Sequence, residues 1–442
     1  MSQEDEEDFK RYKKMLGRLG KPLTMASESL PQTQPKKLRS RGLFPHIVPQ
    51  TPRKTMNSVV DRIRAMPRAS VTLLILVVAG SPCCLAGWMD ITGVKVWNNL
   101  TELGGPKIII EYDLADEGVS PDSPAYVFLH LTKGSDDIWR LIPTDLLGGN
   151  GFDIVTEAGH KKVIWWGTQE FGFEDLGQVE FRVRGIRMAR VPAGRFTMRS
   201  LPGKGKDESF ENEPKSSLAT YYIAQNETTI GMYVDYLNEG CGEGVGYNPK
   251  MAHEGRCGIA LQEDGTYGIA PGREDYPVTY VSWYDAVGFL RWCGLRLPTE
   301  AEWEKACCGG LYLDGDDRQK KPNPLPERRY PWGDEAPNAD GRYRCNYDGE
   351  EDGFAHTAPV ASFAEFSSPY GVCDMAGNVN EWTQDWYTTS YHAGLDGFRV
   401  VRGGSWLDVP EGCDAVSGAT VLPLKEKSIM GFRGLRAPTA TP

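Results

Sequence analysis

Two acidic, glycine-containing segments of the sequence carry the residue types that bind calcium. One runs Asp374-Met-Ala-Gly-Asn-Val-Asn-Glu381, and the other runs Asn346-Tyr-Asp-Gly-Glu-Glu-Asp352-Gly-Phe354. Calcium takes about six to eight hard oxygen ligands from carboxylates, amides and backbone carbonyls, on a chain that glycine bends tightly. The residues therefore allow two cation sites, although from the residues alone two solvated acidic loops are the favoured alternative.

Other common catalytic arrangements are missing from the sequence. The six histidines are scattered, without a pair at the spacing of metal ligands, and no CxxC pair is present for a zinc ribbon or a thioredoxin-like site. The sequence has no P-loop, no dinucleotide-binding glycine fingerprint and no Gly-x-Ser-x-Gly nucleophile elbow. Nucleotide-dependent and serine-hydrolase chemistry are therefore disfavoured.

The charge of the chain is unevenly distributed. Residues 1–70 hold 15 Lys and Arg against 7 Asp and Glu, whereas residues 71–442 hold 34 against 53. A strongly acidic folded part repels nucleic acid and anionic membranes, so both are disfavoured as partners. The 50 glycines, 30 prolines and 12 tryptophans predict short elements joined by long, ordered loops.

The N-terminal region predicts export from the cytoplasm. Residues 1–55 are polar, so they are predicted to be disordered or not translated. Residues 56–87 combine a basic segment, the apolar run 71–80 and small residues near Gly87, which is the pattern of a signal peptide. A signal anchor and a buried core segment are the alternatives, but the run is short for a membrane span. We expect a secreted, periplasmic or cell-surface protein without stable membrane insertion.

Residues 88–187 are predicted to form a small all-β sandwich. Alternating apolar and polar residues are typical of strands at 107–113, 125–131, 161–166 and 179–184, with turn-forming clusters between them. A spacer is the favoured role, and binding of carbohydrate or protein is the alternative.

Residues 188–437 have a different pattern, which predicts an α+β domain rich in loops. Ser282–Trp292 carries apolar residues at helical spacing. Pro298–Ala306 opens with Pro and Thr and places carboxylates in its first turn, which favours a helix N-terminus.

Eight short motifs follow one another in this domain, and none is specific alone. All eight in this order resemble the formylglycine-generating-enzyme, or sulfatase-modifying-factor, family. The resemblance implies an irregular α+β fold related to C-type lectins. The motifs are Val191-Pro-Ala-Gly-Arg-Phe-Thr-Met198, Tyr222-Ile-Ala-Gln-Asn-Glu-Thr-Thr229, Tyr276-Pro-Val-Thr-Tyr-Val-Ser-Trp283, Leu295-Arg-Leu-Pro-Thr-Glu-Ala-Glu-Trp-Glu304, Tyr330-Pro-Trp-Gly-Asp334, Asp374-Met-Ala-Gly-Asn-Val-Asn-Glu-Trp382, Val401-Arg-Gly-Gly-Ser-Trp406 and Gly431-Phe-Arg433.

The resemblance turns both acidic segments into expected calcium sites. In the family, each ion is held by two side chains and two backbone carbonyls at the matching positions. The first set is Asp374, Gly377, Val379 and Glu381, and the second set is Asn346, Tyr347, Asp352 and Phe354.

The catalytic positions match the family less well. Family enzymes oxidise a cysteine of a sulfatase to formylglycine with dioxygen and a copper ion held by two cysteines. The first of these positions is Asp408 here, and only the second, Cys413, is a cysteine. A hard carboxylate and a thiolate make a poor Cu(I) site, so copper is not expected. Ser405 and Glu227 do match pocket residues, although Glu227 could equally be a structural loop carboxylate.

Two further pocket positions and several cysteines also depart from the family. A tryptophan position is Asn380, and a tyrosine position is Gly412. Cys307 matches a disulfide position whose partner is Gly418, so a rearranged bridge among Cys293, Cys307, Cys308 and Cys413 is one possibility. In an exported domain several cysteines are expected to be bridged, and a structural role for Cys413 is favoured.

Two functions of different classes remain. The favoured one is a catalytically divergent, calcium-stabilised binding or surface protein whose ligand is a peptide, a protein or a glycan. The alternative is an active copper-dependent oxidase acting on a sulfatase, in which Cys413, Ser405 and Glu227 would be catalytic. A different enzymatic activity in the same pocket is a third possibility.

Overall fold

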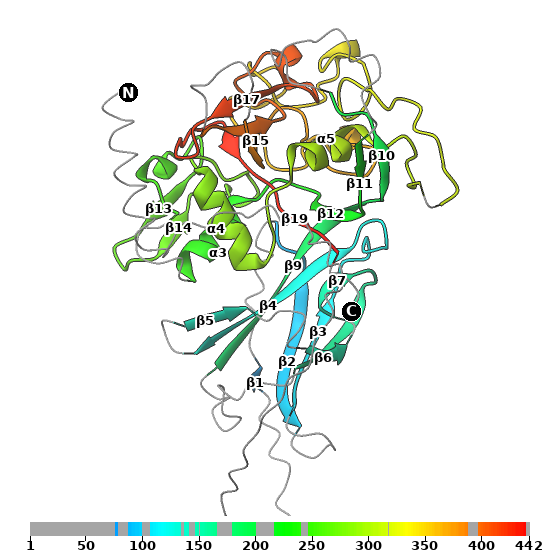
Figure 1. The fold of residues 1–442 in the computed structure, drawn as a ribbon. Coiled ribbons are helices and arrows are strands. Elements are labelled where there is room, and N and C mark those ends of the chain that lie inside the picture. Colours follow the sequence, from blue (N-terminus) through cyan, green and yellow to red (C-terminus); the bar gives the residue numbers. More distant parts are fainter. Residues whose placement is uncertain are drawn as a thin grey trace, which may run out of the picture. The chain divides into compact units, whose positions relative to one another are not determined.

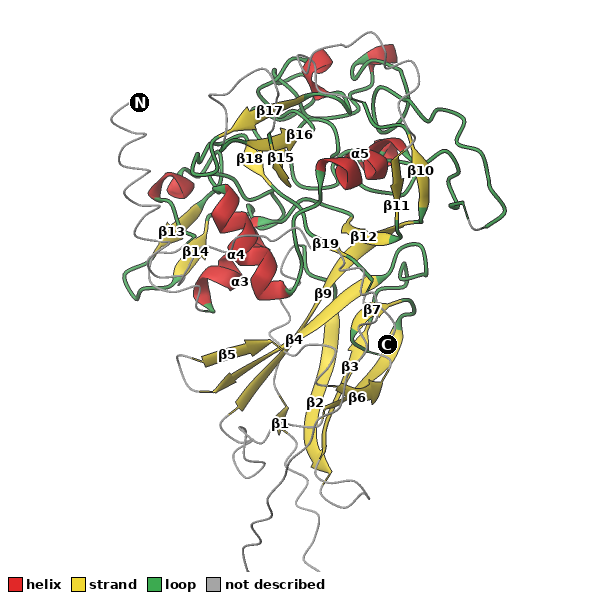
Figure 2. Cartoon of the chain, in the orientation of Figure 1, coloured by secondary structure: helices red, strands yellow, loops and turns green. Residues whose placement is uncertain are grey.

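The structure, a computed structural model, describes residues 76–77, 87–99, 107–133, 137–140, 146–149, 151–165, 179–199, 216–239, 246–316, 318–387 and 397–438 (Figure 1). The predicted disordered or untranslated segment 1–55 lies outside these residues, as does most of the predicted signal peptide 56–87. Helices are few and short among strands and loops (Figure 2), which confirms the predicted α+β class. Within the described ranges, no helix has the length and apolar character needed to cross a bilayer.

Two antiparallel sheets form the N-terminal part of this fold. The first has the order β1-β2-β3-β8-β6 and the second the order β19-β12-β9-β4-β5, with β7 also paired to β4. The strands of the first are β1 Leu76–Val77, β2 Ile91–Asn99, β3 Lys107–Leu114, β8 Gly159–Trp165 and β6 Leu146–Gly149. Those of the second are β19 Leu435–Arg436, β12 Tyr221–Ala224, β9 Val179–Val191, β4 Ala125–Lys133, β5 Asp137–Arg140 and β7 Asp153–Val155.

Side chains from both sheets share one buried core. Ile110 and Tyr112 of β3 lie in the same cluster as Val127 and Leu129 of β4, and each is at most 1% exposed. The strands predicted at 107–113, 125–131, 161–166 and 179–184 are present as β3, β4, β8 and β9. The strand β1 falls within the predicted signal peptide and pairs with β2, Leu76 opposite Val96.

Strand β9 joins this sandwich to the rest of the fold. It is 13 residues long, and its first nine residues pair with β4 while its last four pair with β12. The boundary predicted between residues 187 and 188 therefore falls inside a continuous strand. Phe128 of β4 also packs in the core of the C-terminal part, and the Tyr126 hydroxyl donates to the carbonyl of Cys293 at 2.7 Å.

The C-terminal part contains three α-helices, four short 3-10 helices and three small sheets in the described residues. The helices are α3 Ile230–Asn238, α4 Trp283–Cys293 and α5 Glu300–Cys308, with 3-10 helices at Pro249–Ala252, Ala339–Gly341, Ala364–Phe366 and Pro410–Cys413. Two strand pairs are β10 Gly194–Phe196 with β11 Ser216–Leu218, and β13 Ile259–Leu261 with β14 Tyr267–Ile269. The third sheet, of order β17-β16-β15-β18, contains β15 Asn380–Trp386, β16 Arg399–Arg402, β17 Gly418–Val421 and β18 Met430–Gly431.

Two of the three helices were predictable from their first residues. Ser282 caps α4 and Thr299 caps α5, each in a reciprocal capping box with the residue three positions later. Helix α3 was not predicted, because its sequence Ile-Gly-Met-Tyr-Val-Asp-Tyr-Leu-Asn mixes Gly with β-branched and aromatic residues that are weak helix formers. Burial decides its structure instead: Ile230, Tyr233 and five other residues of this nine-residue helix are buried.

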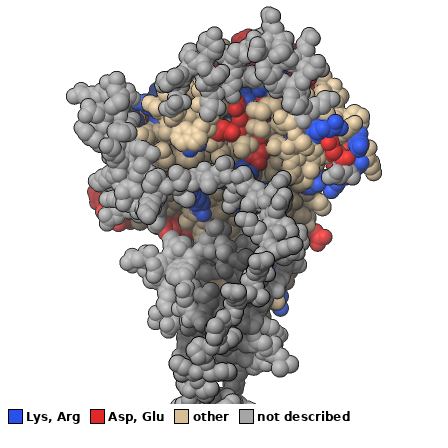
Figure 3. Space-filling model, in the orientation of Figure 1, with Lys and Arg blue, Asp and Glu red and all other residues tan. Residues whose placement is uncertain are grey.

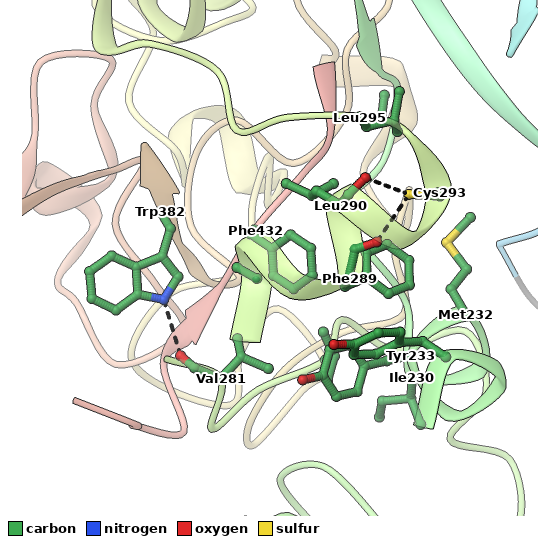
Figure 4. Close-up of a cluster of buried hydrophobic side chains, with 14 of the residues drawn as sticks. Ile230, Met232, Tyr233, Val281, Phe289, Leu290, Cys293, Leu295, Trp382 and Phe432 are labelled. Carbon is green, nitrogen blue, oxygen red and sulfur yellow. Dashed lines mark hydrogen bonds between the residues drawn. The ribbon is translucent and has the colours of Figure 1, made fainter. Parts of the chain in front are cut away.

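These helices pack against the end of the chain in one apolar cluster. Figure 4 shows the rings of Tyr233 of α3, Phe289 of α4 and Phe432 packed together, with centroids 5.8 Å apart for Tyr233 and Phe289 and 5.5 Å apart for Phe289 and Phe432. The Trp382 indole N–H donates to the carbonyl of Val281 at 3.0 Å, so β15 is fixed to the segment before α4 (Figure 4). Residues far apart in sequence thus share a core that no segment could form alone.

A buried charge cluster joins the sandwich to α3. The Glu239 carboxylate receives hydrogen bonds from Arg182 and Arg184 of β9, and His130 of β4 lies 3.5 Å from it. The Arg184 guanidinium also lies over the Trp292 ring, 5.1 Å from its centroid. Burial raises the pKa of Glu239, but the proximity of His130 and the charges of Arg184 and Arg182 outweigh it and lower the pKa to about 2.

We predict that, as the pH falls, the free energy of unfolding decreases less steeply in Glu239→Gln than in the parent protein. Since the folded-state pKa lies below the ordinary value, the carboxylate stabilises the fold fully above about pH 4.5 and progressively less as the pH falls toward 2. The shift corresponds to about 3 kcal/mol at neutral pH. Urea unfolding from pH 7 to pH 3 should show a steeper decline for the parent than for Glu239→Gln. Glu180→Gln, at an exposed partner of Arg182, is the control and should behave as the parent; parallel curves for all three proteins would contradict the prediction.

Candidate functional site

A tight glycine turn positions the residues that match the family's catalytic segment. Strand β16 ends at Arg402, and Gly403 and Gly404 follow with φ of 97° and 72°. A Cβ at Gly404 would lie 2.7 Å from the carbonyl oxygen of Gly412 and 2.9 Å from Cα of Cys413, so only glycine fits where the loop closes on itself. The loop ends in the 3-10 helix Pro410–Cys413.

Asp408 is held by side chains in this loop. The buried Ser405 hydroxyl donates to Oδ2 of Asp408 at 2.6 Å, and the Asn380 amide donates to the same oxygen at 3.5 Å. Its sequence neighbours Leu407 and Val409 are 54% and 57% exposed. The arrangement presents a fixed carboxylate between two exposed apolar groups.

Cys413 is buried in a small cluster that contains a second thiol. Its sulfur lies 3.9 Å from the carbonyl oxygen of Ser405, and it shares a small cluster with Cys345, Tyr347 and Ala376. Burial, followed by a hydrogen bond with Cys413, raises the pKa of the Cys345 thiol well above its usual range. Cys345 was not singled out in the sequence, because nothing in its local pattern links it to a residue so far along the chain.

The expected rearranged disulfide is not supported by the positions of its candidates. Cys293 belongs to the core around α3 and α4, and Cys307 and Cys308 pack beside Trp303, whereas Cys413 lies in the separate cluster with Cys345. The structure therefore does not bring Cys413 together with the other three. Among the described residues, free thiols are carried by Cys257, Cys307, Cys308, Cys345, Cys373 and Cys413.

Glu227 lies with a different set of charges from Ser405 and Cys413. Its buried carboxylate accepts hydrogen bonds from the Asn378 amide at 2.7 Å and the Val379 N–H at 3.3 Å. Burial, together with the charges of Asp374 and Glu381, raises its pKa well above the usual value. The cavity of about 20 Å³ that it lines has room for about one water molecule, so Glu227 sits as a structural loop carboxylate would.

The first predicted calcium set surrounds the same carboxylates. Both oxygens of Glu381 are engaged, by Arg433 at 2.6 and 2.7 Å and by the Trp303 indole N–H at 2.9 Å. Asp374 accepts the Ala361 N–H at 2.6 Å, and burial raises its pKa to about 6. Three carboxylates, those of Glu227, Asp374 and Glu381, thus share one buried guanidinium. The excess negative charge fits a cation, although Glu381 itself has its partners.

The second predicted set contains an unsatisfied oxygen. The Asn346 amide nitrogen donates to the carbonyl of His356 at 2.8 Å and to Oδ1 of Asn378 at 3.0 Å. Its own Oδ1 is buried and receives no hydrogen bond from the part of the chain that the structure describes. Asp352 bends its loop by accepting the N–H groups of Phe354 and Tyr347 at 2.9 and 3.3 Å. A buried carbonyl oxygen is normally paired, so this one fits a hard cation.

The two predicted sets touch each other. A Cβ at Gly377 would lie 2.0 Å from the carbonyl oxygen of Asn346, and the Asn378 N–H donates to that oxygen at 2.9 Å. In the described ranges, no three His, Cys, Asp or Glu side chains gather in a metal-binding group. Amide and backbone oxygens would therefore have to complete each coordination shell, which is the ligand mixture that calcium accepts.

Comparison with known proteins finds the family of this domain. Residues 173–438 match the model of the sulfatase-modifying factor enzyme 1-like domain. Over 220 residues the chain is 36% identical to the formylglycine-generating enzyme of Streptomyces coelicolor; the match covers 45% of this chain and 63% of that protein. Over 142 residues it is 39% identical to a Bos taurus protein named inactive C-alpha-formylglycine-generating enzyme 2; the match covers 31% of this chain and 41% of that protein.

The chain is also similar to the solved structure of CarF. The TM-score is 0.41 at 25% sequence identity, over 57% of this chain and 99% of that chain. The matched segments span less than two thirds of the length of both curated relatives.

Proposed function

Because the chain belongs to the sulfatase-modifying factor enzyme 1-like family, we propose that it is an exported, calcium-stabilised member that binds a peptide, protein or glycan ligand and does not generate formylglycine. The observation that carries this proposal is Asp408. Its carboxylate stands, by the resemblance, where the family has the first copper-binding cysteine, and it is already hydrogen-bonded by Ser405 and Asn380. A hard oxygen in this position disfavours Cu(I).

The surface around Asp408 supports a binding role. Leu407 and Val409 expose apolar side chains on either side of a carboxylate that Ser405 holds in place. Fixed polar groups among apolar surface give orientation and affinity to a bound peptide. The ligand that fits best is a peptide with a basic side chain for Asp408, flanked by apolar residues. Among the described residues on the face in Figure 3, acidic side chains lie near basic ones, a mixture that does not favour a nucleic acid.

The alternative is a copper-dependent oxidase that acts on a sulfatase cysteine. It is supported by the free thiol of Cys413, by the adjacent Ser405 and by the similarity to a formylglycine-generating enzyme. A comparably similar relative carries the word inactive in its name, so overall similarity does not choose between the two. The chemistry at residue 408 favours binding.

The first prediction from the proposed function tests whether the protein is a binding protein or an oxidase. A peptide containing Cys-x-Pro-x-Arg should keep its mass after incubation with the protein, copper and a reductant, because one thiolate beside a carboxylate does not hold Cu(I). An aldehyde-reactive probe read by mass spectrometry measures the product. Stoichiometric aldehyde formation by the unaltered chain would establish the oxidase instead.

A pair of variants tests whether the residue at position 408 is what prevents Cu(I) binding. Asp408→Cys in a Cys345→Ser background gives Cys413 a second thiol in the same loop and removes the competing neighbour. We expect it to gain Cu(I) binding by competition with a chromogenic chelator, whereas Cys345→Ser alone should not. The comparison isolates the residue at 408 because both proteins lack Cys345.

The second prediction concerns calcium at the two acidic segments. Excess calcium should raise the melting temperature, since a ligand that binds only the folded state stabilises it by about 2.7 kcal/mol at a hundredfold excess over its dissociation constant. Asp352→Asn should lose part of this increase, and Glu351→Gln, at the exposed neighbouring carboxylate, should keep it. Glu381→Gln should melt earlier both in calcium and in a chelator, because it leaves Arg433 buried without its charge partner. Identical melting of the parent with and without calcium would contradict the proposal.

The third prediction concerns export. The segment from Gly87 onward is integrated in the fold: the Met89 N–H donates to the carbonyl of Gly185 at 2.8 Å, and the Trp88 ring lies 5.8 Å from that of Phe128. Cleavage near Gly87 would keep both residues. N-terminal sequencing of the secreted protein should therefore begin within a few residues of Gly87, and a product that begins far upstream and needs detergent for extraction would indicate a signal anchor.

A further inference from the structure

Two buried thiols from distant parts of the chain meet beneath the Asp408 loop. Cys345 and Cys413 are 2% and 0% exposed and belong to one cluster with Tyr347 and Ala376, against which Trp332 packs. Two buried thiols in one small cluster, 68 residues apart in sequence, are candidates for a covalent link.

The backbone already holds the two loops together. The Asp348 N–H, three residues after Cys345, donates to the carbonyl of Asp408, five residues before Cys413, at 2.9 Å. The Trp406 N–H donates to the carbonyl of Asn378, and the Asn378 N–H donates to the carbonyl of Asn346, each at 2.9 Å. Because these bonds hold the loop after Cys345 close to the loop before Cys413, a bridge would form between segments that are already in place.

The surroundings favour a neutral bridge over a metal site. A metal would need thiolates, and an apolar pocket disfavours that charged form. The cluster around the pair consists of aromatic and aliphatic groups, and no group of three metal-ligating side chains occurs in the described part of the chain. A disulfide carries no charge and needs no further ligand.

We propose that Cys345 and Cys413 form a disulfide in the exported protein. This inference rests on the export that is part of the proposed function. Both S–H bonds break and one S–S bond forms, while two electrons and two protons pass to a disulfide oxidant such as oxidised glutathione, which is reduced to two thiols. The bridge ties the loop of Asn346 and Asp352 to the loop of Ser405 and Asp408, and it removes the Cys413 thiol from any reaction.

The test is a thiol map of the secreted full-length protein. The protein is denatured without reductant, alkylated, digested and analysed by mass spectrometry, and a second sample is reduced first. We expect a linked peptide pair containing Cys345 and Cys413 that disappears on reduction, while Cys257 and Cys373, which are buried outside the cluster of Cys345 and Cys413, are alkylated in both samples. Alkylation of Cys345 and Cys413 in the unreduced sample, or a link from either to another cysteine, overturns the proposal.

Stability measurements give a second readout. Dithiothreitol should lower the melting temperature of the parent by about 5–10 °C, because the bridge closes a long loop, and it should not change that of Cys345→Ala/Cys413→Ala. In Cys345→Ala alone, Cys413 should become available to alkylation after denaturation. If the variants do not fold, the map of the parent still decides. A free thiol pair in secreted protein that lacks oxidase activity would reject the disulfide and leave the binding function standing; aldehyde formation would reject the binding function.

Discussion

The buried guanidinium of Arg433 joins segments that are otherwise remote in the chain. It contacts both oxygens of Glu381, at 2.6 and 2.7 Å, and donates to the carbonyls of Ala224, Gln225 and Cys373 at 2.8 to 3.1 Å. Through these five hydrogen bonds, the end of β12, the loop before Asp374 and strand β15 are fixed to the end of the chain. Removing one partner of a buried pair costs about 3–5 kcal/mol, because the other charge is left in the interior.

A fold with little regular structure depends on such side-chain bridges. A second buried side-chain bridge, besides that of Arg433, is made by Arg402 of β16. Arg402 is completely buried and pairs with Glu304 at 2.9 Å and Glu300 at 3.0 Å. It holds α5 against the sheet directly before the glycine turn that leads to Ser405. The positions of Ser405, Asp408 and Cys413 therefore follow from buried ionic contacts more than from helix or strand propensity. Loops held in this way can change their exposed residues while the scaffold stays the same.

The candidate site illustrates this separation of scaffold and chemistry. The scaffold motifs around Arg433, Glu381 and Trp303 form the contacts that hold the loops, while the loop at residues 405–413 carries Asp408, which the resemblance places at a thiol position of family enzymes. One fold carries many chemistries, so membership of the family does not establish the reaction. The proposal of a binding protein rests on the hydrogen-bonded carboxylate of Asp408 and on the two exposed apolar side chains beside it.

The sequence by itself determined the family, the α+β class, the four principal strands of the sandwich and the two capped helices. These features depend on local patterns: alternation in the strands, capping boxes at Ser282 and Thr299, and eight motifs whose family is confirmed by the match over residues 173–438. Local patterns did not indicate α3, the continuity of β9 across the expected boundary, or the meeting of Cys345 with Cys413. Tertiary structure decided these, because burial of α3, the pairing of β9 with two partners and the contact of two thiols each depend on residues far away in sequence.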